Sequence, residues 1–275
     1  MRKEGEIMQI SGHTKLMCLI GSPVCHSFSP FIHNFFATQF SDDVVYTTFD
    51  VTPENLDVAI KGAKGLGLVG LNVTSPHKAD VMKYTAEMDV TAQMASAVNL
   101  LKLTTDGFVG YNTDIYGIQM AFRHRGIDVS DKKVAIFGAS GTGRAAAIAM
   151  AQEGCKEMVF TNRTRSKVDF AADMLRSHYK IEVSVCDMVD FDKIDADVLI
   201  MTVLPGIVPQ NLQRFPVIFD ANYSPSGCCA KAFGGLEMLV YQAAQTYEIL
   251  RGITVPQGMI DEVLDILLSG GSHAK

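Results

Sequence analysis

The chain has 275 residues, of which 48% are hydrophobic and 20% charged, so it is long enough to bury the core of one large or two medium α/β domains. No apolar run approaches the length of a membrane span, which excludes an integral membrane protein and leaves a globular, soluble one. A formal net charge of −6 argues against a nucleic-acid-binding surface.

The cysteines and the N-terminal residues indicate a reducing compartment. Six cysteines are scattered along the chain without a CxxC pair, so we expect reduced thiols. Residues 1–6 lack the apolar core of a signal peptide, which favours a cytoplasmic setting. Because Cys25-His26 has no second ligand pair at a matching spacing, we expect no metal site.

Strand-like and helix-like segments alternate in the first part of the chain. The expected strands cover residues 16–21, 46–51 and 67–73, and the expected helices cover residues 29–40 and 53–64. Ser29-Pro30 and Ser75-Pro76 each predict a helix start, with serine as N-cap and proline in the first turn. Alternation of this kind is typical of a mostly parallel sheet covered by helices.

A second β-α series follows a helix expected at residues 115–125. Its expected strands are 132–137, 158–161, 183–185, 198–201 and 217–219, and its expected helices are 145–152, 235–251 and 256–268. We therefore divide the chain into a first domain, residues 1–114, and a second domain, residues 115–247. The last helices, from about residue 248 to 275, are expected to pack back on the first domain.

Two polar segments, residues 72–78 and 112–114, each follow an expected strand and precede an expected helix. Lys78 would lie in the first turn of its helix, where the positive end of the helix dipole disfavours the protonated amine and aids proton transfer. Asp114 would open the next helix. A solvated surface lysine and a capping aspartate are the alternatives, and both stay open at this point.

Ser27 and Ser29 place two hydroxyls at the start of a helix, where unpaired N–H groups favour an anion such as a carboxylate. The alternative is that Ser29 is an N-cap and Ser27 a turn residue. Among the histidines, we interpret His77 as a bystander, and His26 and His33 as structural polar groups.

The segment from Gly138 to Gly143 follows a strand and enters an alanine-rich helix, which is typical of a dinucleotide-binding loop. Ser140 stands where the middle glycine of GxGxxG is expected, so a plain tight turn is the alternative. Past the next strand, residues 161–167 contain three cations and no carboxylate. This favours a 2′-phosphate and therefore NADP over NAD, against the alternative of a solvated basic helix start.

Taken together, these motifs resemble the shikimate dehydrogenase family, whose members reduce 3-dehydroshikimate to shikimate with NADPH in aromatic amino-acid (chorismate) biosynthesis. The resemblance extends from about residue 16 to 252. The matching segments, in the order of the family, are residues 21–30 with His33-Asn34, 72–78, 97–99, 110–114, 138–143, 162–164, 238–239 and 242–243. It implies an N-terminal α/β substrate-binding domain and a Rossmann NADP-binding domain that flank a cleft.

The resemblance also implies site residues. It assigns the substrate carboxylate to Ser27, Ser29 and Tyr223, and the ring hydroxyls to Asn72, Thr74, Asn99, Asp114 and Gln242. Lys78 and Asp114 would be the catalytic pair, and Lys78 would also contact the substrate. NADP contacts are implied at Gly138, Ala139, Ser140, Gly141, Thr142, Gly143, Asn162, Arg163, Thr164 and Lys167, with the 2′-phosphate at Arg163 and Thr164.

Some positions depart from the family pattern. Leu100 and Ile115 replace a threonine and a glycine, and residues 226–229 replace Thr-Pro-Leu-Leu. Three alternatives therefore stay open. They are a quinate/shikimate dehydrogenase that also uses NAD, an enzyme for an amino-substituted shikimate-like compound, and a non-catalytic sensor of dinucleotide and small acid. We expect a small-molecule substrate and no nucleic-acid or membrane partner, and either a monomer or a homodimer.

Overall fold

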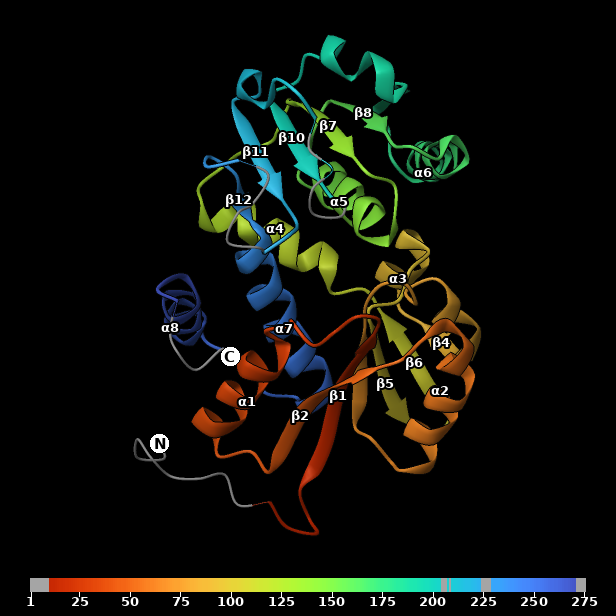
Figure 1. The fold of residues 1–275 in the computed structure, drawn as a ribbon, viewed down its shortest axis with the longest axis vertical. Coiled ribbons are helices and arrows are strands. Elements are labelled where there is room, and N and C mark those ends of the chain that lie inside the picture. Colours follow the sequence, from red (N-terminus) through yellow and green to blue (C-terminus); the bar gives the residue numbers. More distant parts are fainter. Residues whose placement is uncertain (1–9, 204–206, 208, 224–228, 271–275) are drawn as a thin grey trace. The chain divides into compact units, whose positions relative to one another are not determined.

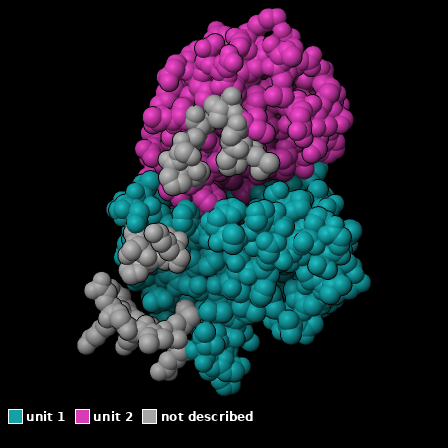
Figure 2. All heavy atoms as spheres, in the orientation of Figure 1, with its two compact units in different colours: residues 1–113, 243–275 teal, residues 114–242 magenta. Residues whose placement is uncertain are grey.

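The structure is a computed structural model that describes residues 10–203, 207, 209–223 and 229–270. It divides into two compact units, which are coloured separately in Figure 2. The first unit comprises Met1–Thr113 and Ala243–Lys275, and the second comprises Asp114–Gln242. The unit boundaries therefore fall at residues 113/114 and 242/243, where the sequence suggested 114/115 and 247/248.

The first unit is built on a six-stranded sheet with the order β2-β1-β3-β5-β6-β4. Its strands are β1 (Lys15–Gly21), β2 (Val44–Asp50), β3 (Gly70–Val73), β4 (Thr85–Met88), β5 (Leu100–Thr104) and β6 (Gly107–Tyr111). Strand β5 runs antiparallel to β3 and β6, whereas the pairs β1–β2, β1–β3 and β4–β6 are parallel. The expected mostly parallel α/β sheet is thus confirmed, with one reversed strand.

Helices cover both faces of this sheet (Figure 1). They are α1 (Ser29–Phe40), α2 (Leu56–Gly65), α3 (Val90–Ala95), α8 (Gln257–Leu268) and the second half of α7 (Gly235–Arg251), with 3₁₀ turns η1 (Pro53–Asn55) and η2 (Asp80–Tyr84). Leu71 and Val73 of β3 face an apolar core formed with α2 and α3. Because side chains alternate along a strand, Asn72 points to the opposite face, toward α7.

The second unit is a parallel sheet with the order β12-β11-β10-β7-β8-β9. Its strands are β7 (Lys133–Phe137), β8 (Glu157–Thr161), β9 (Glu182–Val185), β10 (Val198–Met201), β11 (Val217–Asp220) and β12 (Phe233–Gly234). Its helices are α4 (Asp114–His124), α5 (Gly141–Gln152), α6 (Arg165–His178) and the first half of α7, with 3₁₀ turns η3 (Met188–Lys193) and η4 (Leu212–Arg214). In chain order this sheet reads 3-2-1-4-5-6, the order of a Rossmann fold, so the chain reverses direction across the sheet between β7 and β10.

One predicted helix is wrong. Residues 75–79 form turns after β3, and the helical segment that follows is the 3₁₀ turn η2, so Ser75-Pro76 opens no α-helix. The backbone closes a tight turn from His77 N–H to Thr74 O at 2.9 Å, and the His77 ring is drawn back toward Val51 O at 2.6 Å. These contacts reverse the chain where an α-helix would have extended it. Lys78 therefore does not lie in the first turn of an α-helix, so the predicted effect of a helix dipole on its amine is wrong as well.

Candidate functional site

In the first unit, one hydrogen bond joins the two predicted carboxylate-binding serines, and a separate chain of hydrogen bonds begins at Tyr46 and reaches a predicted ring-binding asparagine. The Ser27 hydroxyl donates to Ser29 Oγ at 3.1 Å. The Tyr46 hydroxyl donates to Asn72 Oδ1 at 2.9 Å. Helix α1 supplies Ser29, β2 supplies Tyr46 and β3 supplies Asn72.

The same chain continues from Asn72 to Asn99. The Asn72 Nδ2 group donates to Thr246 Oγ1 at 3.2 Å and to the Asn99 carbonyl at 3.3 Å. The Asn99 side chain then accepts from Thr113 N–H at 2.8 Å and donates to Thr113 Oγ1 at 3.0 Å. Thr113 Oγ1 also lies 3.4 Å from Thr246 Oγ1. Within one unit, Ser27 is therefore joined to Ser29, and Asn72 is joined to Asn99.

Sequence reasoning missed Tyr46 and Thr246, which hold this network together. Thr246 is fully buried and lies four residues after Gln242, so both side chains share one face of α7. That spacing was a usable signal. For Tyr46 the local sequence offered no comparable signal, because a tyrosine in a strand is most often a packing residue.

The turn that carries Lys78 is fixed at several points. Besides the contacts of His77, the Lys78 carbonyl accepts a hydrogen bond from Val98 N–H at 2.8 Å. Thr74 lies so close to β1 that a Cβ at Gly21 would come within 2.3 Å of its methyl group. His77 has a structural role in this turn, because its buried ring ties the turn of Thr74 and Lys78 to the end of β2.

Asp114 and Gln242 belong to the second unit. Asp114 is buried and opens α4, directly after Thr113. Gly117, one turn further, approaches α7 closely, since a Cβ there would lie 2.9 Å from Cβ of Gln242 and 2.6 Å from the Met238 carbonyl. Glycine at 117 thus allows the start of α4 and the middle of α7 to pack together. The Gln242 side chain donates a hydrogen bond to the Leu239 carbonyl at 2.9 Å.

Tyr223 follows β11 and is half-buried. Its neighbour Asn222 is anchored to Asp220 and to the Val203 carbonyl through Nδ2, at 2.8 and 2.9 Å. The start of α7 presses against this segment, because a Cβ at Gly235 would come within 2.2 Å of the Asn222 carbonyl.

The glycine loop of the second unit lies between β7 and α5, at the point where the strand order reverses. Gly138 has a φ of 119°, which L side chains rarely adopt. A Cβ at Gly143 would lie 2.3 Å from the Gly138 carbonyl, so the first turn of α5 can approach the loop only with glycine there. Ser140 is the N-cap residue, Ala139 is buried, and Gly141 and Thr142 begin α5. The helix start thus presents N–H groups suited to a pyrophosphate.

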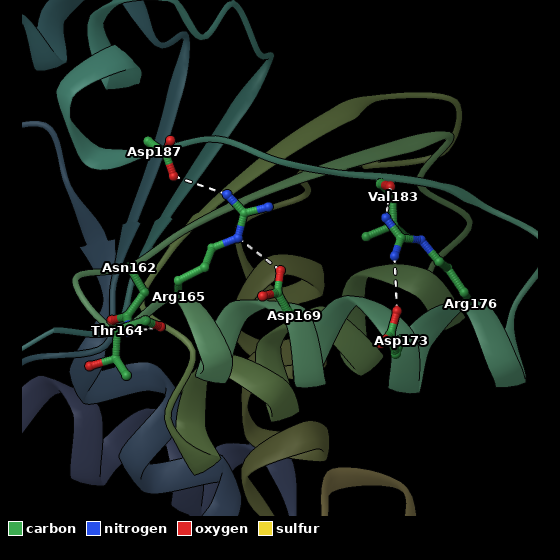
Figure 3. A network of polar contacts seen from close by, with 8 residues as sticks. All are labelled: Asn162, Thr164, Arg165, Asp169, Asp173, Arg176, Val183 and Asp187. Carbon is green, nitrogen blue, oxygen red and sulfur yellow. Dashed lines mark hydrogen bonds and ion pairs between the residues drawn. The ribbon is translucent and has the colours of Figure 1, made fainter.

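A basic segment follows β8 at the start of α6. The Asn162 side chain donates to the Thr164 carbonyl at 3.2 Å, and Thr164 is the N-cap residue of α6. Figure 3 shows that Arg165 points away from this turn, toward Asp169 and Asp187, with N···O distances of 2.9 and 3.0 Å. Two acidic residues from outside the 161–167 window therefore engage one of its three cations.

The other two cations, Arg163 and Lys167, remain available. Both side chains are exposed, and within the described part of the chain neither makes a side-chain hydrogen bond or an ion pair. Thr164 is exposed beside them. This is the arrangement that a phosphate group at the start of α6 would need.

Burial shifts the pKa of two aromatic groups in the first unit. His33 is fully buried, and burial lowers its pKa to about 3, so the ring is neutral. Its ring stacks on that of Tyr46, with centroids 4.2 Å apart and planes 9° from parallel. Burial also raises the pKa of Tyr46 well above its ordinary value, so the phenol keeps its proton.

Comparisons with known proteins identify the family of this chain. A family model of the shikimate dehydrogenase substrate binding domain matches residues 19–101, and one of shikimate / quinate 5-dehydrogenase matches residues 119–204. The NADP⁺-dependent shikimate dehydrogenase of Methanocaldococcus jannaschii is 37% identical, over 89% of this chain and 94% of that protein. The chain belongs to the shikimate dehydrogenase family.

Solved shikimate dehydrogenases share the fold along nearly the whole chain. A crystal structure of a shikimate dehydrogenase in complex with NADP⁺ has a TM-score of 0.79 at 34% identity and covers 94% of this chain and 97% of its own. The Listeria monocytogenes shikimate 5-dehydrogenase, in complex with shikimate and NAD, has a TM-score of 0.80 at 26% identity and covers 94% and 99%. The family and the fold class predicted from the sequence are confirmed.

The structure also locates the departures from the shikimate dehydrogenase pattern. Leu100 is fully buried and lies opposite Asn72 in the β3–β5 ladder. Ile115 is buried in the first turn of α4, next to Asp114. Residues 226–228 lie outside the described part of the chain, and Cys229 is half-buried. Among the described residues, no helix combines the length and apolar character that crossing a membrane requires.

Proposed function

We propose that this protein catalyses the reversible, NADPH-dependent reduction of 3-dehydroshikimate to shikimate in aromatic amino-acid biosynthesis. The observation that carries the proposal is that one unit contains the hydrogen-bonded pair Ser27 and Ser29 and the hydrogen-bonded pair Asn72 and Asn99. Hydroxyl donors together with side-chain amides suit a small ring with a carboxylate and several hydroxyls. Membership of the shikimate dehydrogenase family supports this choice of ring.

The substrate contacts follow from this proposal. Ser27, Ser29 and Tyr223 bind the carboxylate, which the N–H groups at the start of α1 help to stabilise. The ring hydroxyls are bound by Asn72, Thr74, Asn99, Asp114 and Gln242. Asn72 and Asn99 are buried and already hydrogen-bonded in the structure, so their amides are held in a fixed orientation before the ligand arrives.

The second unit binds NADP in this proposal. The residues fit the group, because the close approach of Gly143 to the Gly138 carbonyl brings the start of α5 directly onto the loop after β7, where helix N–H groups can bind a pyrophosphate. Ala139, Ser140, Gly141 and Thr142 complete that cradle, Asn162 shapes the turn, and Arg163, Thr164 and Lys167 hold the 2′-phosphate. When bound, NADPH supplies the hydride.

Lys78 and Asp114 supply the acid–base chemistry in this proposal. Lys78 donates a proton to the alkoxide oxygen that develops as the ketone is reduced, and it takes the proton back in the reverse direction. Asp114 orients the Lys78 amine and accepts a hydrogen bond from the neighbouring ring hydroxyl. General acid help of this kind is worth about 10²–10⁴-fold in rate.

A quinate/shikimate dehydrogenase that also uses NAD is the second candidate. It is favoured by the match to the shikimate / quinate 5-dehydrogenase model and by the Listeria structure with NAD. A matrix of initial rates separates the two, with shikimate and quinate each assayed with NADP and NAD. We expect the highest kcat/KM for shikimate with NADP; a comparable value for quinate or for NAD would favour the second candidate.

We propose that the protein acts on a small-molecule substrate in the cytoplasm and has no nucleic-acid or membrane partner. It would work as a monomer or a homodimer. Sedimentation of the purified protein would distinguish the two oligomeric states.

A further inference from the structure

Tyr46 contacts one residue of the proposed substrate site directly. Its side chain is buried, with 3% of its surface exposed, and its hydroxyl donates to Asn72 Oδ1 at 2.9 Å. The Tyr46 hydroxyl therefore binds the side chain of a residue assigned to a ring hydroxyl.

The position of Tyr46 is fixed by α1. The Asn34 side chain binds the Tyr46 backbone twice, from Nδ2 to the carbonyl at 2.9 Å and from the Tyr46 N–H to Oδ1 at 2.8 Å. The preceding residue, His33, stacks on the Tyr46 ring. Because the same helix begins with Ser29, the phenol is held at a set distance from the serine pair.

The phenol oxygen has a defined hydrogen-bonding role. Burial raises the pKa of Tyr46, so the O–H group persists and remains a donor at any working pH. The Asn99 carbonyl can only accept, so the Asn72 NH₂ group faces it and Thr246, and the Asn72 oxygen faces the Tyr46 hydroxyl. Tyr46 thus supplies the donor that holds the buried Asn72 oxygen in this orientation.

We propose that Tyr46 is a positioning residue for substrate binding, which holds the Asn72 amide through the hydrogen bond to its oxygen. This inference rests on the proposed function, since it concerns the same site. Tyr46 acts through Asn72 and takes no part in proton transfer. Its loss should therefore weaken substrate binding and leave kcat and NADP binding nearly unchanged.

The test compares Tyr46→Phe with Tyr247→Phe in the full-length protein. Tyr46→Phe keeps the ring, the stack on His33 and the backbone bonds to Asn34, and removes only the hydroxyl. Tyr247 is the matched control, because it is also buried and near the His33 ring, but its hydroxyl donates to Asp42 at 2.7 Å, outside the substrate network. The readouts are kcat, the KM values for shikimate and NADP, and Tm.

For Tyr46→Phe we expect the shikimate KM to rise roughly three- to tenfold, the effect of one buried hydrogen bond, with kcat and the NADP KM within about twofold. Tyr247→Phe should lower Tm and leave the shikimate KM within about twofold. An unchanged shikimate KM in Tyr46→Phe, or an equal rise in both variants, would overturn the inference. An inactive parent protein would overturn the proposed function and this inference with it, whereas an active parent with an unaffected variant would overturn the inference alone.

Discussion

Asn72 donates a hydrogen bond to Thr246 at 3.2 Å across a sequence separation of 174 residues. Both side chains are buried, and the bond joins β3 near the start of the chain to α7 near its end. It explains why the last part of the chain belongs to the first unit, since α7 completes the polar network that β2 and β3 begin. The site in the first unit therefore depends on residues at both ends of the sequence.

Thr246→Val should weaken this site while keeping its shape. The change removes the acceptor for Asn72 and the contact with Thr113, and leaves the Asn72 NH₂ group with the longer of its two bonds, at 3.3 Å. We expect a loss of about 1–3 kcal/mol in the free energy of unfolding and a higher shikimate KM. Denaturant unfolding and steady-state kinetics measure both. Thr254→Val, at an exposed site, is the control, and equal effects in the two variants would refute the role of Thr246.

Lys78→Ala should reduce turnover by about 10²–10⁴-fold while NADPH binding persists, because the variant loses the proposed proton donor and not the cofactor site. Lys83→Ala is the matched control, since Lys83 lies in the adjacent 3₁₀ turn and is exposed. Turnover and NADPH fluorescence titration give the two readouts. Near-parental turnover in Lys78→Ala would show that the assigned role is wrong.

Arg163→Ala should raise the KM for NADP by about tenfold or more and leave the KM for NAD nearly unchanged, because only NADP carries the 2′-phosphate. Arg165→Ala tests whether the effect is specific to Arg163. Arg165 is the first residue of α6, two positions after Arg163, but it is paired with Asp169 and Asp187. We expect a much smaller effect there. If Arg165→Ala gave the larger increase, the 2′-phosphate site would have to be reassigned.

Some elements of the fold are set by neighbouring residues, and others are set by contacts between residues far apart in the chain. Strand β10 and helix α7 have the predicted bounds, because an apolar run and a helical period are properties of neighbouring residues. A strand was expected before residue 112 and is β6, but β5 and the turn between them were missed although Asp106-Gly107 is a turn signal, and Gly107 has a φ of 127°. The predicted helix at Ser75-Pro76 is wrong, and the His77 ring of this turn contacts Val51, a residue outside the local window.

The candidate site shows the same division. Residue types in short motifs suggested Ser27, Ser29, Asn72 and Asn99, and hydrogen bonds join Ser27 to Ser29 and Asn72 to Asn99. Tyr46 could not be chosen from local sequence, because its function depends on which polar group it meets, whereas the spacing of Thr246 from Gln242 was a signal that was not used. The ion pair from Asp187 to Arg165 was missed for the same reason, since it joins residues 22 positions apart.

His33 should make the protein sensitive to mild acid. Its pKa of about 3 in the folded state lies below the ordinary value of 6.5, so between these values the unfolded chain binds a proton that the folded chain does not. The free energy of unfolding should therefore fall as pH drops below about 6.5, by at most about 1.4 kcal/mol per pH unit from this group. In the described structure neither ring nitrogen has a hydrogen-bond partner.

His33→Phe should remove this dependence, because phenylalanine keeps the stack on Tyr46 and has no proton to gain. Urea unfolding at pH 7 and pH 5 should show a smaller loss of stability in His33→Phe than in the parent. The exposed His13, substituted in the same way, should leave the loss unchanged. An identical loss in the parent and in His33→Phe would contradict the burial-lowered pKa.

Transfer of deuterium from NADPH that carries deuterium at both C4 positions to 3-dehydroshikimate is the most direct measurement of the proposed activity. The purified protein should consume one NADPH per shikimate formed, and the shikimate should carry one deuterium on the carbon that was the C3 ketone. NADPH and 3-dehydroshikimate that both bind without any labelled product would contradict the account and favour a non-catalytic sensor.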